Sequence, residues 1–266
     1  MKIAIVGCGN MGMAFARSFV QYDLVKKEDL LLIEKSRERS EMLRSQKEGV
    51  VVDTINHSVG EYDLVILSVK PQDFLSVTAE LRGFLQPDQV VLSIMAGIPM
   101  ARIQAELAHR QVVRAMPNTP AMLGQGITGY YAAEGISFQK LQRIDNLINA
   151  TGRSVYLENE ELIDAVTALS GSGPAYFYYL VKHMVEAGVK MGFDEGLARL
   201  LVKQTMLGSY HLINNAEQSL DELIAAVASK GGTTEAALKT FGEKNLGPSL
   251  IEGILKAEER AKELSK

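Results

Sequence analysis

The sequence predicts a doubly wound, mostly parallel α/β sheet over residues 1–157, followed by an all-α domain over residues 158–266. Three observations support this prediction. Short β-rich segments alternate with helical patterns in the first part, the apolar runs at 64–67 and 90–92 do not alternate with polar residues, and strand signals stop after about Leu157. Alternating strands and helices form parallel sheets with right-handed crossovers, and continuously apolar strands are buried on both faces.

The elements follow from this periodicity. We expect strands at residues 2–6, 30–34, 50–53, 63–68, 89–94, 112–115, 126–132 and 154–157. Helical patterns between them cover residues 11–22, 37–46, 72–84, 100–107 and 138–150. The second part contains helical segments at 160–168, 173–191, 194–214, 219–227, 234–244 and 249–264. Residues 169–173 are expected to form a Gly/Ser turn, with Ser172 as a cap and Pro174 at the first helical position.

The helical part has largely apolar faces, for example over residues 196–208, and a domain of this size has difficulty burying them alone. We therefore expect it to complete its core against a second copy in a homodimer. The alternative is a self-sufficient monomeric bundle.

Composition restricts the partners. Hydrophobic residues make up 47% of the 266 residues, charged residues 23%, and the formal net charge is −4. Without a basic stripe or a stretch approaching roughly 20 apolar residues, neither nucleic acid nor a membrane is an expected partner. The single cysteine, Cys8, excludes an internal disulfide. A lone thiol and no secretory leader fit a cytoplasmic protein. Four scattered histidines and one cysteine give no recognisable metal site.

A glycine-rich loop follows the first predicted strand directly. It reads Gly7-Cys8-Gly9-Asn10-Met11-Gly12 and opens a helix. Gly7 permits the tight turn, Gly9 lets the backbone approach a pyrophosphate, and Gly12 lets the helix pack on the strand. Free amides at a helix N-terminus then face the phosphates, so the loop predicts a Rossmann dinucleotide site. A structural glycine turn is the alternative.

The end of the second predicted strand should contact the adenosine ribose. Glu34 lies 22 residues after Gly12, where a carboxylate would bind the ribose hydroxyls of NADH. Lys35 and Arg37 lie beside it and would pair with the 2′-phosphate of NADPH. Because the two signals conflict, the sequence leaves the choice between NADPH and NADH open.

Further loops leave the carboxyl ends of predicted strands, where open α/β sheets bind ligands. The candidates are Ser68, Val69, Lys70 and Pro71 after one strand, Ala96 and Gly97 after the next, and Asn118 after a third. Ala96 and Gly97 are small enough for a flat ring to lie close. The loop around Asn118 is stiffened by Pro117 and Pro120, and it either closes over a nicotinamide or connects the domains rigidly.

The helical half contains a second glycine turn. Ser229-Lys230-Gly231-Gly232-Thr233-Thr234 precedes a helix, where exposed amides and hydroxyls suit a carboxylate. An ordinary threonine cap is the alternative.

Together these motifs resemble the pyrroline-5-carboxylate reductase family nearly end to end. The resemblance runs from the first glycine loop through residues 69–71, 116–120 and 170–176, and it ends in residues 229–238. It implies reduction of (S)-1-pyrroline-5-carboxylate to L-proline by NADPH or NADH. It also implies homodimers formed through the helical domains, and in many family members these dimers assemble further. It further implies that Asn56 and residues 68–70 contact the adenosine side of the cofactor, while Ala96, Gly97 and Asn118 line the nicotinamide side.

The resemblance also assigns the second glycine turn. Ser229, Gly231, Gly232 and Thr233 would hold the substrate carboxylate, and Thr234 would hydrogen-bond the ring nitrogen as the catalytic residue. A β-hydroxyacid dehydrogenase would need a lysine four residues after Gly173, where this chain has Phe177. A non-catalytic dinucleotide sensor would have no use for the second turn.

Overall fold

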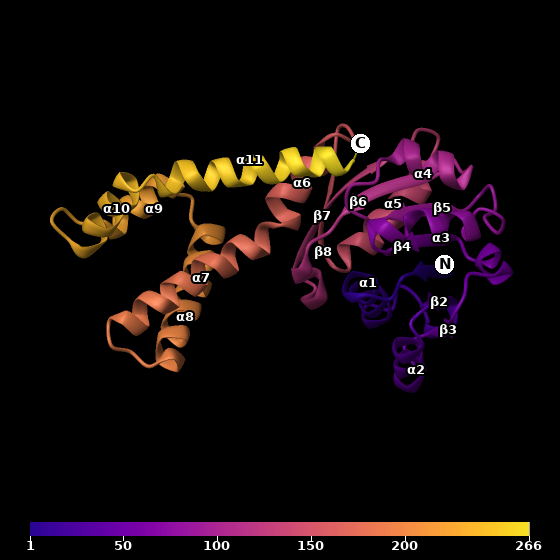
Figure 1. The fold of residues 1–266 in the computed structure, drawn as a ribbon, viewed down its shortest axis with the longest axis horizontal. Coiled ribbons are helices and arrows are strands. Elements are labelled where there is room, and N and C mark those ends of the chain that lie inside the picture. Colours follow the sequence, from indigo (N-terminus) through magenta and orange to yellow (C-terminus); the bar gives the residue numbers. More distant parts are fainter. Residues whose placement is uncertain (266) are drawn as a thin grey trace. The chain divides into compact units, whose positions relative to one another are not determined.

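The computed structural model describes residues 1–265 and divides into two compact units. Unit 1 comprises Met1–Pro174 together with the chain from Ala257 onward, and unit 2 comprises Ala175–Lys256. Figure 1 shows the elements of both units.

Unit 1 contains one eight-stranded sheet with the order β3-β2-β1-β4-β5-β6-β7-β8. Its strands are β1 Ile3–Val6, β2 Leu30–Ile33, β3 Val50–Val52, β4 Leu64–Leu67, β5 Val90–Ser93, β6 Val112–Met116, β7 Gly126–Ala132 and β8 Gly152–Tyr156. Strands β1 to β6 run parallel, β7 is antiparallel to β6, and β8 is parallel to β7. The order reverses beside β1, which places a switch point, the usual ligand position in such sheets, at the carboxyl end of β1.

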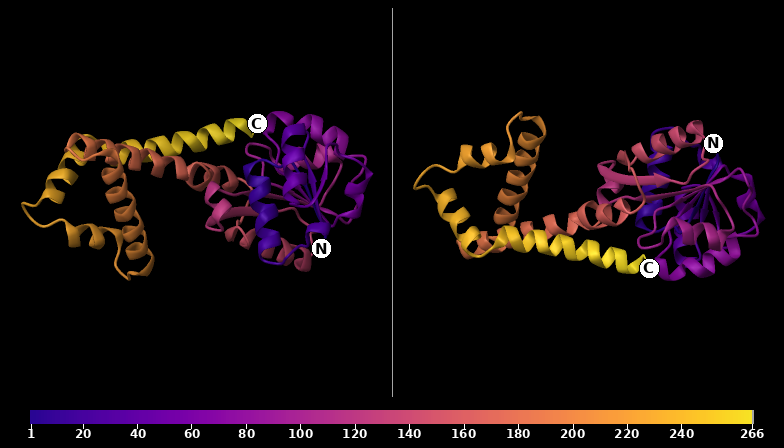
Figure 2. Two further views of the ribbon diagram at one scale, coloured as in Figure 1. Left: turned by 90° about the horizontal axis from the view of Figure 1, so that it is seen from below. Right: turned by 90° about the horizontal axis from the view of Figure 1, so that it is seen from above.

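Helices cover both faces of this sheet (Figure 2). They are α1 Asn10–Gln21, α2 Arg37–Gln46, α3 Phe74–Leu81, α4 Met100–Leu107, α5 Phe138–Asn149 and α6 Leu162–Val166. Alternate residues of each strand enter different cores because side chains point to opposite faces. Ile3 and Ile5 pack with Phe15 of α1, whereas Ala4 and Val6 belong to the core that contains Phe74 of α3.

Short helices connect several of these elements. They are η1 Lys27–Asp29, η2 His57–Glu61, η3 Pro71–Asp73 and η4 Thr119–Leu123, and the π-helical turn η5 Thr167–Gly171. Together, α3 and η3 account for the helix expected at 72–84.

Unit 2 contains most of α7 Gly173–Lys190, then α8 Glu195–Asn215, α9 Leu220–Val227 and α10 Thr233–Glu243. The chain returns to unit 1 along α11 Leu246–Leu264. Helices α7 and α8 lie side by side (Figure 1), and their contact buries Val185, Ala198 and Val202. Most other large apolar side chains of this unit are exposed in the single chain.

The predicted fold class is confirmed by the sheet and the helical segments that follow it. The expected Gly/Ser turn before α7 is wrong. Thr167–Gly171 forms a π-helical turn, and Ser172 has helical dihedral angles while its amide donates to Thr167 O. Helix therefore continues from α6 into α7, and Ser172 does not act as an N-cap. Among residues 1–265, no helix has both the length and the apolar character needed to cross a membrane.

Candidate functional site

The first glycine loop forms a cradle at the carboxyl end of β1. Gly7 has φ +94°, which L side chains rarely adopt, and a Cβ on Gly12 would lie 2.3 Å from Gly7 O. A Cβ on Gly9, by contrast, would have no described atom within 4 Å. Gly9 is also the N-cap of α1, so no side chain shields the amides of the first turn. The cradle is therefore closely packed at Gly7 and Gly12 and open at Gly9, where a pyrophosphate can approach the backbone amides.

A groove of about 420 Å³ adjoins this cradle. Seven of the predicted cofactor residues line it, namely Gly7, Gly9, Glu34, Lys35, Ser68, Val69 and Lys70. Ser68 O would lie 2.7 Å from a Cβ on Gly7, so the loop after β4 packs directly on the glycine loop. The structure thus brings the ends of β1, β2 and β4 together around one groove.

Glu34 is held by its own surroundings in this groove. One carboxylate oxygen accepts from the Ser36 amide at 2.9 Å. The other accepts from the Cys8 amide at 3.2 Å and pairs with Arg39 Nη1 at 3.3 Å. The side chain is only 6% exposed. Through these contacts Glu34 connects the glycine loop to Arg39.

The cations near Glu34 differ in their surroundings. Lys35 Nζ pairs with Asp73 at 2.6 Å, and this hydrogen bond raises the pKa of Lys35. Arg37 pairs with Glu41 on the surface of α2 and is not among the residues that line the groove. Arg39, which the sequence analysis missed, lines the groove one turn into α2.

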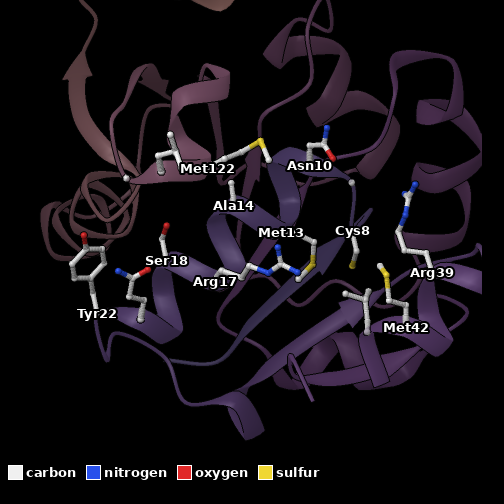
Figure 3. Close-up of a pocket in the computed structure, with 15 residues that line it drawn as sticks. Cys8, Asn10, Met13, Ala14, Arg17, Ser18, Tyr22, Arg39, Met42 and Met122 are labelled. Atoms are coloured by element: carbon white, nitrogen blue, oxygen red, sulfur yellow. The ribbon is translucent and has the colours of Figure 1, made fainter. Parts of the chain in front are cut away.

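A second groove of about 460 Å³ runs along α1 (Figure 3). Asn10 and Cys8 line it, and Arg39 borders both grooves. Met11 is partly buried and packs against the core instead. Burial, then the charge of Glu34, raises the pKa of Cys8 to about 12, so its thiol stays neutral.

The remaining cofactor candidates are spread over neighbouring loops of unit 1. Asn56 caps η2 by accepting from the Ser58 amide at 2.9 Å, and Pro71 is exposed at the start of η3. Ala96 packs against Met116, Leu157 and Ile163. Gly97 has φ +70°, and Asn118 Oδ1 accepts from the Ile127 amide at 3.0 Å.

The second glycine turn joins α9 to α10 in unit 2, where it projects at a tip of that unit (Figure 2). Gly231 has φ +75°, the Gly232 amide donates to Ser229 O at 2.9 Å, and a Cβ on Gly232 would lie 2.6 Å from Ser229 Oγ. Thr233 and Thr234 begin α10. The turn thus gathers the predicted substrate-binding residues.

The chain itself places a carboxylate on this turn. Glu235 Oε2 accepts from the Gly231 amide at 2.6 Å. The sequence analysis missed this contact, although a Glu in the first turn of a helix is a common capping signal. In this structure the Gly231 amide is therefore paired within the chain itself.

A glycine cradle beside a groove lined by both basic and acidic side chains, on a doubly wound sheet followed by helices, defines a dinucleotide-binding oxidoreductase. Two family models match separate parts of the chain: NADP oxidoreductase coenzyme F420-dependent over residues 2–97, and pyrroline-5-carboxylate reductase dimerisation over residues 160–264. The chain belongs to the pyrroline-5-carboxylate reductase family.

Relatives match over nearly their whole length. The chain is 37% identical to the pyrroline-5-carboxylate reductase of Pseudomonas aeruginosa, covering 99% of this chain and 97% of the relative. Identity to the enzyme of Haemophilus influenzae is 34%, over 98% and 97% respectively. The structure of a pyrroline-5-carboxylate reductase from Coxiella burnetii superposes with a TM-score of 0.89 at 30% identity, covering 100% and 98% of the two chains.

A second solved structure contains a cofactor. The Plasmodium falciparum pyrroline carboxylate reductase with NADP bound has a TM-score of 0.90 and 25% identity, with coverage of 100% and 98%. These matches leave no support for the β-hydroxyacid dehydrogenase alternative. At the position where that class needs a lysine, Phe177 is 62% exposed on α7. The nearest helix lysine, Lys182, pairs with Glu186.

Proposed function

We propose that this chain reduces (S)-1-pyrroline-5-carboxylate to L-proline with NADPH or NADH. The observation that carries the proposal is the match to pyrroline-5-carboxylate reductases along the whole chain, for example 37% identity over 99% of this chain to the Pseudomonas aeruginosa enzyme. Family membership supplies the substrate, and the glycine cradle fits the dinucleotide.

The residues have simple tasks in this reaction. The cofactor supplies a hydride, and a protonated cyclic imine accepts hydride readily, so the protein needs little acid–base machinery. Gly7, Gly9 and Gly12 position the pyrophosphate half through backbone amides. Ser229, Gly231, Gly232 and Thr233 hold the substrate carboxylate, and Thr234 orients the ring nitrogen by a hydrogen bond. Holding substrate and cofactor in this geometry lowers the activation barrier, because their translational and rotational freedom is already lost on binding.

The test is direct. Purified protein mixed with NADPH or NADH should oxidise the cofactor only when pyrroline-5-carboxylate is added, and proline should form in equal amount. Cofactor oxidation with a β-hydroxyacid but not with the imine would overturn the assignment. Binding of the dinucleotide with no turnover on either substrate would make the chain a sensor instead.

The cofactor preference follows from the groove. We infer that NADPH is preferred, because the carboxylate of Glu34 is engaged by two amides and neutralised by Arg39. The Arg39 guanidinium is about half exposed in the groove and is a suitable partner for a 2′-phosphate.

Replacing Arg39 tests this preference. Arg39→Ala should raise KM for NADPH by about 10- to 100-fold, the range of a charge-assisted hydrogen bond, and change KM for NADH little. Arg37→Ala is the matched control, because Arg37 pairs with Glu41 outside the groove. Equal effects of Arg39→Ala on both cofactors would contradict the inference.

The exposed apolar side chains of the helical unit support a homodimer. Apolar side chains such as Phe177, Leu200 and Ile213 are 62%, 63% and 54% exposed in the single chain, while its own contact between α7 and α8 buries few residues. The match to a dimerisation model over residues 160–264 supports the same conclusion. We therefore place a dinucleotide-binding domain at residues 1–157 and a helical substrate-binding and dimerisation domain at 158–266. The neutral, buried thiol of Cys8 suits the reducing cytoplasm, which cell fractionation tests directly.

A further inference from the structure

A buried ion cluster in unit 1 lies behind the nicotinamide-side loops. Arg114 on β6 is 2% exposed, and its guanidinium pairs with Glu160 at 2.8 Å and Asp164 at 3.0 Å. Charges buried in this way are poor evidence of a stabilising role, because desolvation offsets much of their attraction. The contacts of this cluster with neighbouring segments indicate a role in fixing their geometry.

The cluster connects two segments that are far apart in the sequence. Glu160 Oε1 accepts from the amide of Met100, the first residue of α4, at 2.7 Å. Ser265 Oγ hydrogen-bonds Asp164 Oδ1 at 3.1 Å, just after the end of α11. One cluster thus fixes both the start of α4 and the C-terminal turn of the chain.

The loop at residues 95–99 lies directly before α4 and contacts this C-terminal turn. A Cβ on Gly97 would lie 2.9 Å from Leu264 Cβ and 3.2 Å from Leu264 O. The Gly97 backbone is therefore in close contact with Leu264. With φ +70° at Gly97, the loop adopts a conformation that few other residues tolerate.

We propose that Leu264 and Ser265 form a positioning element for the nicotinamide half of the cofactor. Ser265 is hydrogen-bonded to Asp164 of the Arg114 cluster, and the Cβ and carbonyl of Leu264 pack against the Gly97 backbone. This proposal rests on the proposed function and on the family resemblance, which implies that Ala96 and Gly97 line the nicotinamide side of the cofactor. The two residues act through the loop and do not touch the reacting atoms.

Binding of whole and partial cofactor separates a positioning role from a general structural one. Ser265→Ala removes a hydrogen bond to the Asp164 carboxylate, and Leu264→Gly removes the Cβ that contacts Gly97. Each should weaken NADPH binding by about two- to tenfold, because each acts on the cofactor only through the loop. Binding of 2′,5′-ADP, which contains only the adenosine half, should stay unchanged. Ser265→Thr keeps the hydroxyl and should restore NADPH binding.

A control is available on the same helix. Lys262 pairs with Glu258 at 2.6 Å on the surface of α11, so Lys262→Ala should change the affinity for neither ligand. Unchanged NADPH binding in both Leu264 and Ser265 variants would overturn the proposal, and so would parallel losses for NADPH and 2′,5′-ADP. The binding assay needs no substrate, so failure of the wild-type protein to reduce the imine would overturn the proposed function separately.

Discussion

At the scale of single residues, the chemistry of Cys8 is set by its burial inside the glycine loop. The thiol is 2% exposed, and its sulfur lies 3.7 Å from Ile33 O. Burial first, and the charge of Glu34 second, raise its pKa from 9.0 to about 12. The side chain therefore fills space beside the cofactor cradle without acting as a nucleophile.

This shift has a measurable effect on stability. In the unfolded chain the thiol ionises near its ordinary pKa, whereas in the folded chain it stays neutral up to the raised value. The group's contribution is complete below pH 9 and is lost as the pH rises from 9 towards 12. Between about pH 8 and pH 10, the wild type should lose about 1 kcal/mol more unfolding free energy than Cys8→Ala. Urea titrations at both pH values measure this, and identical losses would show that the thiol is not desolvated.

Thr234 should act on turnover alone. Thr234 lies in the first turn of α10, directly after the second glycine turn. Its alcohol is too weak an acid to act as the proton donor at neutral pH. Thr234→Ala should lower kcat by about 10- to 100-fold, as expected for a lost hydrogen bond to a charged nitrogen, with NADPH affinity unchanged. Thr234→Ser keeps the hydroxyl and should retain most of the activity. Normal kcat in the alanine variant would remove Thr234 from the catalytic role.

At the scale of elements, the glycine loop separates packing from binding. Gly12 faces inward, where a Cβ would collide with Gly7 O, and Gly9 faces an open space that fits a phosphate. Gly12→Ala should therefore cost about 1–3 kcal/mol of stability and also weaken NADPH binding. Gly9→Ala should weaken binding while leaving stability within about 0.5 kcal/mol of wild type. Thermal unfolding with and without NADPH tests both, and a stability loss in Gly9→Ala would contradict this division.

The strands were largely predictable, because short, continuous apolar runs are typical of strands that are buried on both faces of a parallel sheet. All eight strands lie within two residues of their expected bounds. The π-helical turn at Thr167–Gly171 was not predictable, since Gly and Ser residues favour turns locally and only tertiary packing holds them helical. The loops on the nicotinamide side were assigned only through the family resemblance. From the residues alone, the loop around Asn118 could equally have been a rigid connection between the domains.

The site was predictable where backbone geometry demands glycine and less so where side chains form tertiary contacts. The cradle followed from the spacing of Gly7, Gly9 and Gly12. Arg39 was not predicted, because its contact with Glu34 is made from within α2 and not from the strand end itself. Arg114 was not predicted as a buried ion-pair residue, because its partners Glu160 and Asp164 are 46 and 50 residues away and no local pattern links them.

At the scale of the whole molecule, the helical unit lacks a sufficient core of its own. Its contact between α7 and α8 buries Val185, Ala198 and Val202, whereas many larger apolar side chains stay exposed in one chain. Exposed apolar area of this extent marks an interface. A second copy can cover it because homo-oligomers commonly pair the same surface on both subunits.

A charge placed on this surface should separate the copies. Leu200 on α8 is 63% exposed, and Leu200→Glu would bury a carboxylate in the proposed interface, which should weaken association at least about 100-fold. Phe138→Glu is the matched control, because Phe138 is 77% exposed at the start of α5 in unit 1. Sedimentation velocity should find a dimer for the wild type and the control and a monomer for Leu200→Glu, and circular dichroism should show reduced helix content in Leu200→Glu. A wild-type monomer that keeps its full helix content would mean that the unit is stable with its apolar faces in water, and the dimer proposal would then be wrong.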